Sequence, residues 1–272
     1  MIAGVKGETR IHVSRNAMNL SKSFPLGTML GKVLRYPLPF VRPGMEVRFL
    51  QGALRGKKWL AGTMGRGVWL GTFEYEKRRL FEKTVRPGDV VFDVGACVGF
   101  YSLLASVLVG KTGRVFAFEP LPANIRDLNE HLKRNKITNV TVIQSAVSDA
   151  AGFALFNPGP DRSMGHLSAQ GTLAVKTVSL DAMVEEGNCP APDHIKIDVE
   201  GSEMPVLRGA VSLLAHRRPA LYVATHGSEI HGEVLRFLRS LGYVVTPIRG
   251  ESLEQTDELF AEDPYRAKTV NG

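Results

Sequence analysis

Two acidic residues and a pair of glycines have types and spacing that suit ligand binding. Asp93 lies at the end of an apolar run, Gly95 and Gly99 follow it, and Glu119 ends the next apolar run. A glycine turn between a strand and a helix lets backbone amides approach a ligand, and the helix N-terminus adds positive partial charge. A carboxylate at the tip of the second strand is placed to accept hydrogen bonds from both hydroxyls of a ribose. The pattern therefore predicts a nucleoside-binding turn.

The charge beside the turn distinguishes between nucleoside cofactors. A dinucleotide site favours three glycines in the pattern GxGxxG, but position 97 is a cysteine here and an acid precedes the turn. A pyrophosphate would be repelled by Asp93, whereas an ammonium group would be attracted to it. We therefore expect S-adenosyl-L-methionine, which carries both an amine and a ribose, and a nicotinamide cofactor is the least favoured alternative. The residues expected to bind the cofactor are Asp93, Gly95, Ala96, Gly99, Glu119 and Pro120.

A second group of acids follows another apolar run. Asp198 ends the strand-like residues 195–198 and Glu200 comes two residues later, at the edge where open α/β sheets bind ligands. Asp198 could position an amine, orient an acceptor hydroxyl or serve as general base. His226 follows a later strand and has two interpretations, a general base or a cap of the helix that begins near residue 227. We predict Asp198, His226 and Glu200 as catalytic residues, and no metal, because no third metal ligand is identifiable.

Alternating strand and helix signals from Arg86 onward supply the scaffold for these residues. Such alternation predicts a mostly parallel sheet with helices on both faces. We expect strands at 90–94, 114–118, 139–144, 195–198, 220–224 and 243–248, and helices at 100–109, 122–135, 202–216 and 229–241. An insertion carries two strand-like runs, 153–156 and 173–178, around a glycine-rich segment, 159–171, that we expect to be mobile.

The N-terminal part differs in texture and charge. Residues 1–44 read as a basic, irregular arm, residues 45–83 as a small strand and helix extension, and residues 84–272 as the cofactor-binding domain. The first sixty residues hold eleven Lys and Arg against two acids, a net charge of +9, while the whole chain carries +7. A basic arm can contact nucleic acid, but its aromatic residues show no repeated spacing for stacking bases. We do not expect nucleic acid as the partner.

Composition excludes several classes of protein. The chain has 272 residues, 44% of them hydrophobic and 22% charged, which is typical of a folded globular protein and excludes overall disorder. Its two cysteines, Cys97 and Cys189, cannot form a disulfide framework or a zinc cluster. No apolar run reaches the roughly 18 residues of a membrane-spanning helix, and no signal peptide is recognisable. We expect a cytoplasmic protein with no membrane span. The sequence is compatible with a homo-oligomer and does not determine the oligomeric state.

Three motifs carry a family resemblance. The segments DVGACVGFY, FAFEP and IKIDVEGSEMPVLRGA resemble the FkbM family of S-adenosylmethionine-dependent methyltransferases, as does the upstream VWLGTFEYE. The likeness covers about residues 60–248. It implies a class I methyltransferase (Rossmann-like) fold, with a seven-stranded, mostly parallel sheet whose last strand is antiparallel. It also implies O-methylation of a small-molecule hydroxyl acceptor, such as a polyketide-type natural product or a sugar.

Two positions depart from the family pattern. Cys97 stands where members often have Asn, and Ala224 stands where relatives often have Glu two residues before the histidine. Two alternative functions therefore remain in addition to a small-molecule methyltransferase. One is a nucleic-acid methyltransferase that uses the basic arm, and the other is a non-catalytic S-adenosylmethionine-binding module, which the alanine favours.

The remaining histidines and aromatic residues have simpler interpretations. We expect His131 and His216 at the surface and His166 in an exposed loop. Aromatic residues of the extension are expected in a small core, and Glu74 is the acid among them that merits a test because it belongs to the family segment. The aromatic residues are Trp59, Trp69, Phe73 and Tyr75.

Overall fold

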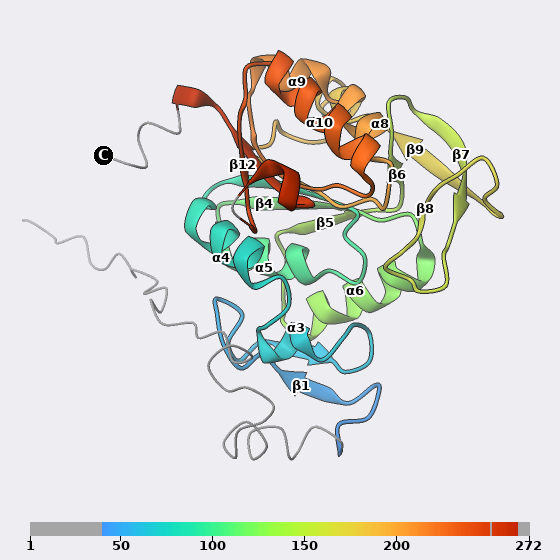
Figure 1. The fold of residues 1–272 in the computed structure, drawn as a ribbon. Helices are drawn as coiled ribbons and strands as arrows, with labels where there is room; N and C mark the ends of the chain where they lie inside the picture. Colours follow the sequence, from blue (N-terminus) through green and yellow to red (C-terminus); the bar gives the residue numbers. More distant parts are fainter. Residues whose placement is uncertain (1–39, 251, 266–272) are drawn as a thin grey trace, which may run out of the picture.

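Seven strands form the central sheet of the computed structural model, which describes residues 40–250 and 252–265 (Figure 1). Most of the arm predicted at 1–44 lies outside the described residues. The order is β12-β13-β11-β10-β3-β4-β5. β13 is the one strand of this sheet that runs in the opposite direction to the other six. The strands are β3 (Val90–Val94), β4 (Arg114–Phe118), β5 (Val140–Ile143), β10 (His194–Ile197), β11 (Ala220–Ala224), β12 (Val244–Pro247) and β13 (Glu258–Glu262). The predicted sheet with an antiparallel last strand is confirmed.

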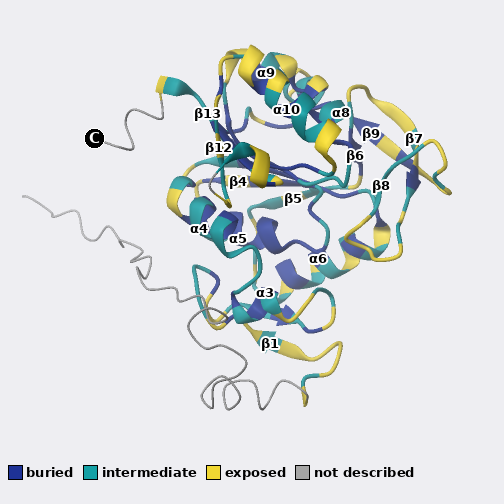
Figure 2. Ribbon diagram, in the orientation of Figure 1, coloured by how far each residue is buried: buried dark blue, intermediate teal, exposed yellow. Residues whose placement is uncertain are grey.

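Alternate residues of each strand pack against helices on opposite faces. Phe92 of β3 faces one apolar core and Val91 faces the other, as the two-residue period of a strand requires. Figure 1 shows α8, α9 and α10 above the sheet and α4, α5 and α6 below it. Figure 2 shows buried strands between helices with exposed outer faces. The helices are α4 (Tyr75–Thr84), α5 (Phe100–Val109), α6 (Pro122–Arg134), α7 (Leu180–Glu185), α8 (Glu203–Arg208), α9 (Val211–His216) and α10 (Ser228–Ser240), with a 3-10 turn, η2 (Leu253–Gln255).

The helix predicted at 202–216 is divided into α8 and α9. A Cβ atom at Gly209 would lie 2.1 Å from the carbonyl oxygen of Ser148, so the chain approaches the backbone of another segment at this point. The prediction of a single helix over 202–216 was therefore wrong. Helical periodicity in the sequence does not reveal a close contact with a distant segment.

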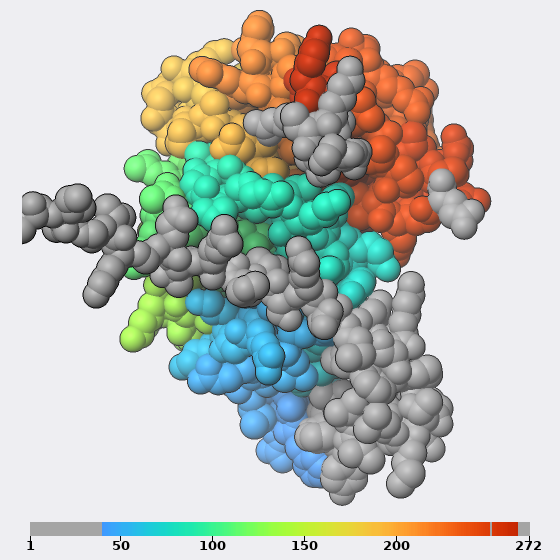
Figure 3. Space-filling model, turned by 90° about the vertical axis from the view of Figure 1, so that its left-hand side faces the viewer, coloured from blue at the N-terminus to red at the C-terminus, as the bar shows by residue number. Residues whose placement is uncertain are grey.

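The N-terminal extension shares the lower core of the sheet domain. It contains β1 (Glu46–Arg48), β2 (Lys58–Leu60) and α3 (Gly67–Leu70), and Figure 3 shows it in blue at the end opposite the orange helices. Trp59 is buried and stacks on His131 of α6, with ring centroids 3.6 Å apart. Trp69 is buried as well, so the core expected for these two tryptophans is confirmed.

His131 is buried rather than exposed, so the surface prediction for it was wrong. Its Nε2 accepts a hydrogen bond from the amide of Leu60 at 3.1 Å, and its Nδ1 lies 2.9 Å from the carbonyl oxygen of Val98. Burial lowers the pKa of His131 to about 4. A hairpin distant in sequence covers this face of α6, which the local pattern does not disclose. His216 is exposed, as expected.

The insertion forms a separate four-stranded sheet in the order β6-β9-β7-β8. Its strands are β6 (Ala146–Val147), β7 (Gly152–Asn157), β8 (His166–Leu167) and β9 (Leu173–Val178). Both predicted strand runs are confirmed, and β8 lies within the glycine-rich segment. No helix among the described residues is long and apolar enough to cross a bilayer.

Candidate active site

The turn after β3 and the end of β4 form the first part of the site. The amides of Gly95 and Ala96 donate hydrogen bonds to the carbonyl oxygen of Phe118, at 3.1 and 3.0 Å, and hold the turn against β4. The amide of Cys97 donates to Oε2 of Glu119 at 2.8 Å. The turn and the acid predicted to bind one nucleoside are therefore in direct contact.

Glu119 is buried and ordered by its own neighbours. Its Oε1 accepts from the amide of Leu121 at 2.9 Å and from Nδ2 of Asn124 at 3.2 Å. Burial raises the pKa of Glu119, although the hydrogen-bond donors oppose this shift. An ionised carboxylate has about four lone-pair sites, and donors of the protein occupy three of them on Glu119. One site is left for a ribose hydroxyl, and contact with a second hydroxyl would need one donor, such as the side chain of Asn124, to move away.

A first cavity, with about 500 Å³ of empty space, opens beside Glu119. Residues of the insertion close its other side, including Phe156 and His166, so the simple exposed-loop interpretation of His166 was wrong. Predicted site residues on its wall are Gly95, Glu119, Pro120 and Asp198.

Asp93 and Gly99 line neither this cavity nor the second one described below. Asp93 is 1% exposed; its Oδ2 accepts from Oγ of Ser102 at 2.6 Å and its Oδ1 lies 3.4 Å from Nζ of Lys196. The structure thus places Asp93 beneath the turn. A Cβ atom at Gly99 would lie 2.7 Å from Cγ of Leu128, so this glycine lets α6 pack closely on the turn.

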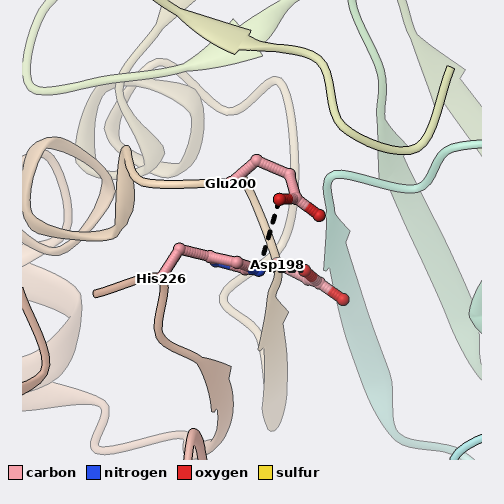
Figure 4. Close-up of side chains that lie close together, drawn as sticks. All are labelled: Asp198, Glu200 and His226. Carbon is pink, nitrogen blue, oxygen red and sulfur yellow. Dashed lines mark ion pairs between the residues drawn. The ribbon is translucent and has the colours of Figure 1, made fainter. Parts of the chain in front are cut away.

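Asp198, Glu200 and His226 come together beyond the ends of β10 and β11 (Figure 4). Nε2 of His226 lies 3.5 Å from a Glu200 oxygen and 3.8 Å from an Asp198 oxygen. Its Nδ1 lies 2.9 Å from Oε1 of Glu203, which is fully buried. The structure therefore brings all three predicted catalytic residues into one cluster, and it adds Glu203 as the group that orients the imidazole.

These contacts determine the charge of His226. The hydrogen bond to Glu203, followed by attraction from Glu200, raises the pKa of His226 to about 9 against the desolvation of a half-buried ring. The cap interpretation was wrong, because α10 begins after Gly227 without a side-chain cap. In the free protein His226 is an imidazolium at neutral pH.

The same cluster contains the third metal ligand that sequence reasoning did not identify. One donor atom from each of Asp198, Glu200 and His226 lies within 4.8 Å of the others. Imidazole nitrogen and carboxylate oxygens suit several divalent metals. The set could therefore hold a cation, but the carboxylates already face protonated groups of the protein.

Two buried lysines surround Asp198 and were not predicted. Lys77 of α4 lies 3.7 Å and Lys196 of β10 lies 3.9 Å from an Asp198 oxygen. Burial alone would raise the pKa of Asp198, but attraction to Lys196 and Lys77 outweighs it and lowers the pKa. Asp198 is thus held ionised. A lysine inside an apolar strand is the signal for Lys196, since buried lysines need partners.

Ala224 has an acid beside it on the neighbouring strand. Its register partner in the antiparallel pair of β11 and β13 is Glu258, and opposed residues project to the same face. Oε1 of Glu258 accepts a hydrogen bond from Nζ of Lys77 at 2.8 Å. The alanine that departs from the family pattern therefore lies next to a carboxylate.

A second cavity, with about 690 Å³ of empty space, lies on the other side of the turn. The extension contributes Met64, Phe73 and Glu74, and the core contributes Phe100 and Tyr101. Phe73 thus lines this cavity and also packs against the lower core, as expected. Four residues line both cavities: Gly95, Cys97, Ser163 and Asp198.

Strained backbone is concentrated around these cavities. Of the five non-glycine residues with positive φ in the described chain, Glu74 (φ 40°), Cys97 (φ 50°) and Glu200 (φ 54°) belong to the site. Such conformations cost of order 1–3 kcal/mol each and are enriched at functional sites. Asn adopts this region more readily than most residues, which gives a physical reason for Asn where Cys97 stands.

The strand order and the position of the cavities define a class I methyltransferase fold, with the site at the carboxyl ends of β3, β4 and β10. The strand order reverses between β3 and β10, where open sheets bind ligands. The Methyltransferase FkbM domain matches residues 93–245. The chain belongs to the FkbM methyltransferase family.

Two curated relatives and one solved structure are similar to this chain. The chain is 34% identical over 143 residues to hexuronic acid methyltransferase AglP of Haloferax volcanii, an alignment that covers 52% of this chain and 58% of the relative. It is 29% identical over 212 residues to 31-O-demethyl-FK506 methyltransferase FkbM of Streptomyces tacrolimicus, covering 65% and 78%. The solved methyltransferase FkbM from Methylobacillus flagellatus has a TM-score of 0.49 and 17% identity, covering 73% of this chain and 55% of that chain.

Proposed function

We propose that this chain is an S-adenosylmethionine-dependent O-methyltransferase that acts on a hydroxyl of a small molecule. The observation that carries the proposal is the pair of cavities that meet at Gly95 and Asp198. One cavity has a ribose acceptor, Glu119, and the other has Asp198 and Glu200 on its wall. His226 lines neither cavity but lies 3.5 Å from Glu200 and 3.8 Å from Asp198. A methyl donor in the first and an acceptor in the second would meet where the cavities join.

The residues of the first cavity fit the cofactor. Glu119 accepts a ribose hydroxyl, and the N-terminus of α5 favours the methionyl carboxylate through its positive partial charge. The excess of carboxylates around Asp198 favours the cationic end of the molecule. When bound, the cofactor supplies an activated methyl group. Asp93 and Gly99 act indirectly here, by fixing the turn.

The residues of the second cavity handle the acceptor. Asp198, held ionised by Lys77 and Lys196, accepts a hydrogen bond from another donor group of the acceptor and so orients the reacting oxygen. His226 in its neutral form takes the hydroxyl proton at Nε2, and Glu203 stabilises the resulting imidazolium. Glu200 contacts the imidazole ring of His226 at Nε2, 3.5 Å away, and helps to orient the ring. The names of the two curated relatives favour a natural product or a sugar as the acceptor class.

Methyl transfer from labelled S-adenosylmethionine to a panel of hydroxyl compounds tests this function. Label should appear as a methyl ether in the acceptor, and Asp198→Asn should reduce transfer while cofactor binding persists. Binding of the cofactor without transfer to any acceptor would instead indicate a binding module. Transfer only to RNA would indicate the nucleic-acid alternative.

A further inference from the structure

The second cavity is lined by acidic and aromatic residues. The acids are Glu74, Asp198 and Glu200, and the aromatic residues include Phe73 and Phe100. Lys196 is the one basic residue on the described wall. Whether this lysine can attract an anion therefore decides which acceptors enter.

The charge of Lys196 is already matched inside the protein. Its Nζ donates to the carbonyl oxygen of Gly95 at 2.8 Å and lies 3.4 Å from Asp93 and 3.9 Å from Asp198. The side chain is 5% exposed. Lys196 is thus turned into the protein, and little of its charge is offered to a ligand.

Lys77 does not line the cavity, and its charge is also paired with carboxylates of the protein. Its Nζ lies 2.6 Å from Glu74 and 2.8 Å from Glu258, and its side chain is 2% exposed. Two lysines and His226 face more carboxylates than they can neutralise. The acids of this cluster are Glu74, Asp93, Asp198, Glu200, Glu203 and Glu258.

Glu74 lines the cavity and is held in place by its contacts. It precedes α4 in a left-handed conformation, φ 40° and ψ 50°, and its side chain makes no cap hydrogen bond. Instead its Oε2 accepts a hydrogen bond from the hydroxyl of Tyr101 at 2.8 Å. A conformation of this cost persists only where surrounding contacts enforce it.

We propose that Glu74 is a specificity-determining residue, which makes the second cavity select against acceptors with a negative charge near the reacting hydroxyl. This inference rests on the proposed function for the identity of the cavity as the acceptor site. The chemical class it favours is a neutral or cationic hydroxyl compound, because the carboxylate wall accepts hydrogen bonds from hydroxyl and ammonium groups and repels carboxylates.

Cys97 is a natural reporter of this charge, because it lines both cavities and is partly exposed, whereas Cys189 is buried. The probes are 2-aminoethyl and 2-sulfonatoethyl methanethiosulfonate, which are similar in size and opposite in charge. Mass spectrometry gives the rate at which each modifies Cys97, and each rate is divided by the rate with free cysteine. The full chain is used without cofactor, so the result does not depend on methyl transfer.

The cationic reagent should react at least about tenfold faster than the anionic one, a ratio that corresponds to about 1.4 kcal/mol. Glu74→Gln should lower this ratio several-fold, while Glu76→Gln, a matched loss of charge on α4 outside the cavity wall, should leave it unchanged. If Glu74→Gln does not fold, Glu200→Gln, which also removes a charge from the cavity wall, should lower the same ratio of reaction rates.

Two results would overturn the proposal: equal or faster reaction with the anion, or a ratio insensitive to Glu74→Gln. Failure of the proposed function would appear separately, as loss of cofactor binding with the charge preference intact.

Discussion

The α-carbon of Gly95 packs directly against the carbonyl oxygen of Asp198, so that a Cβ atom at residue 95 would lie 1.9 Å from that oxygen. The two residues come from separate sequence motifs, and both line both cavities. This backbone contact joins the turn after β3 to the end of β10, and so fixes the cofactor side of the site relative to the acceptor side.

Gly95→Ala should therefore disrupt the site. The clash is with backbone, which cannot turn aside, so we expect loss of cofactor binding and a lower unfolding temperature. Gly187→Ala is the matched control, because Gly187 also has positive φ (74°) but has open space around its Cα. The control should show only the conformational cost of roughly 1–2 kcal/mol. Equal cofactor affinity and stability in the two variants would contradict the close contact.

The raised pKa of His226 predicts an alkaline pH dependence. Only the neutral ring accepts a proton, and its fraction grows as pH rises toward about 9. The ratio kcat/KM, which reports the groups of the free enzyme, should therefore increase with pH between 6 and 9, and His226→Gln should remove the dependence and lower kcat/KM roughly 10²–10⁴-fold. His216→Gln, at an exposed position, should keep the wild-type profile. A profile flat from pH 6 to 9 would show that the proton goes to a carboxylate.

We expect no requirement for a divalent metal. The carboxylate of Asp198 already faces Lys77 and Lys196, and Glu200 faces His226, so the attraction for another cation is reduced by like charges. Dialysis against EDTA should leave the rate of methyl transfer unchanged, and added Mn²⁺ should not raise the unfolding temperature. A rate that falls on dialysis and returns with Mg²⁺ or Mn²⁺ would instead make Asp198, Glu200 and His226 a metal site.

His131 should make the protein sensitive to acid. Its pKa falls from 6.5 to about 4 on folding, so between these values the unfolded chain binds a proton that the folded chain does not. The free energy of unfolding should decrease as pH falls through this window, by up to about 3 kcal/mol. Urea unfolding of His131→Gln should show lower stability at pH 7 and a weaker decline toward pH 4. An equal decline in variant and wild type would assign the effect to other groups.

The sequence could predict those parts of the site that lie at strand ends. Glu119 and Asp198 each follow an apolar run, and parallel strands bring their carboxyl ends to one edge. Gly95 was identifiable because only a residue without a side chain suits such a turn. The mostly parallel sheet followed from the alternation of strands and helices together with the family resemblance, whereas β13 was not among the expected strands.

The remaining features depend on contacts between distant segments. Lys77 looks like one charge among several on α4, and its burial arises only when β10 and β13 bring carboxylates to it. His131 reads as a surface histidine until the N-terminal hairpin covers it. The interpretation of His166 failed for the same reason, because the insertion folds back over the first cavity.

Isothermal titration of S-adenosylmethionine into the protein tests the central claim most directly. The account predicts one binding site per chain, no binding of NADH, and an affinity about 10–100-fold weaker in Glu119→Ala, as expected for loss of a hydrogen bond to a charged group. Glu130→Ala, on the same side of the molecule but outside both cavities, should bind as the wild type does. Absence of binding to the wild type, or unchanged affinity in Glu119→Ala, would contradict the account.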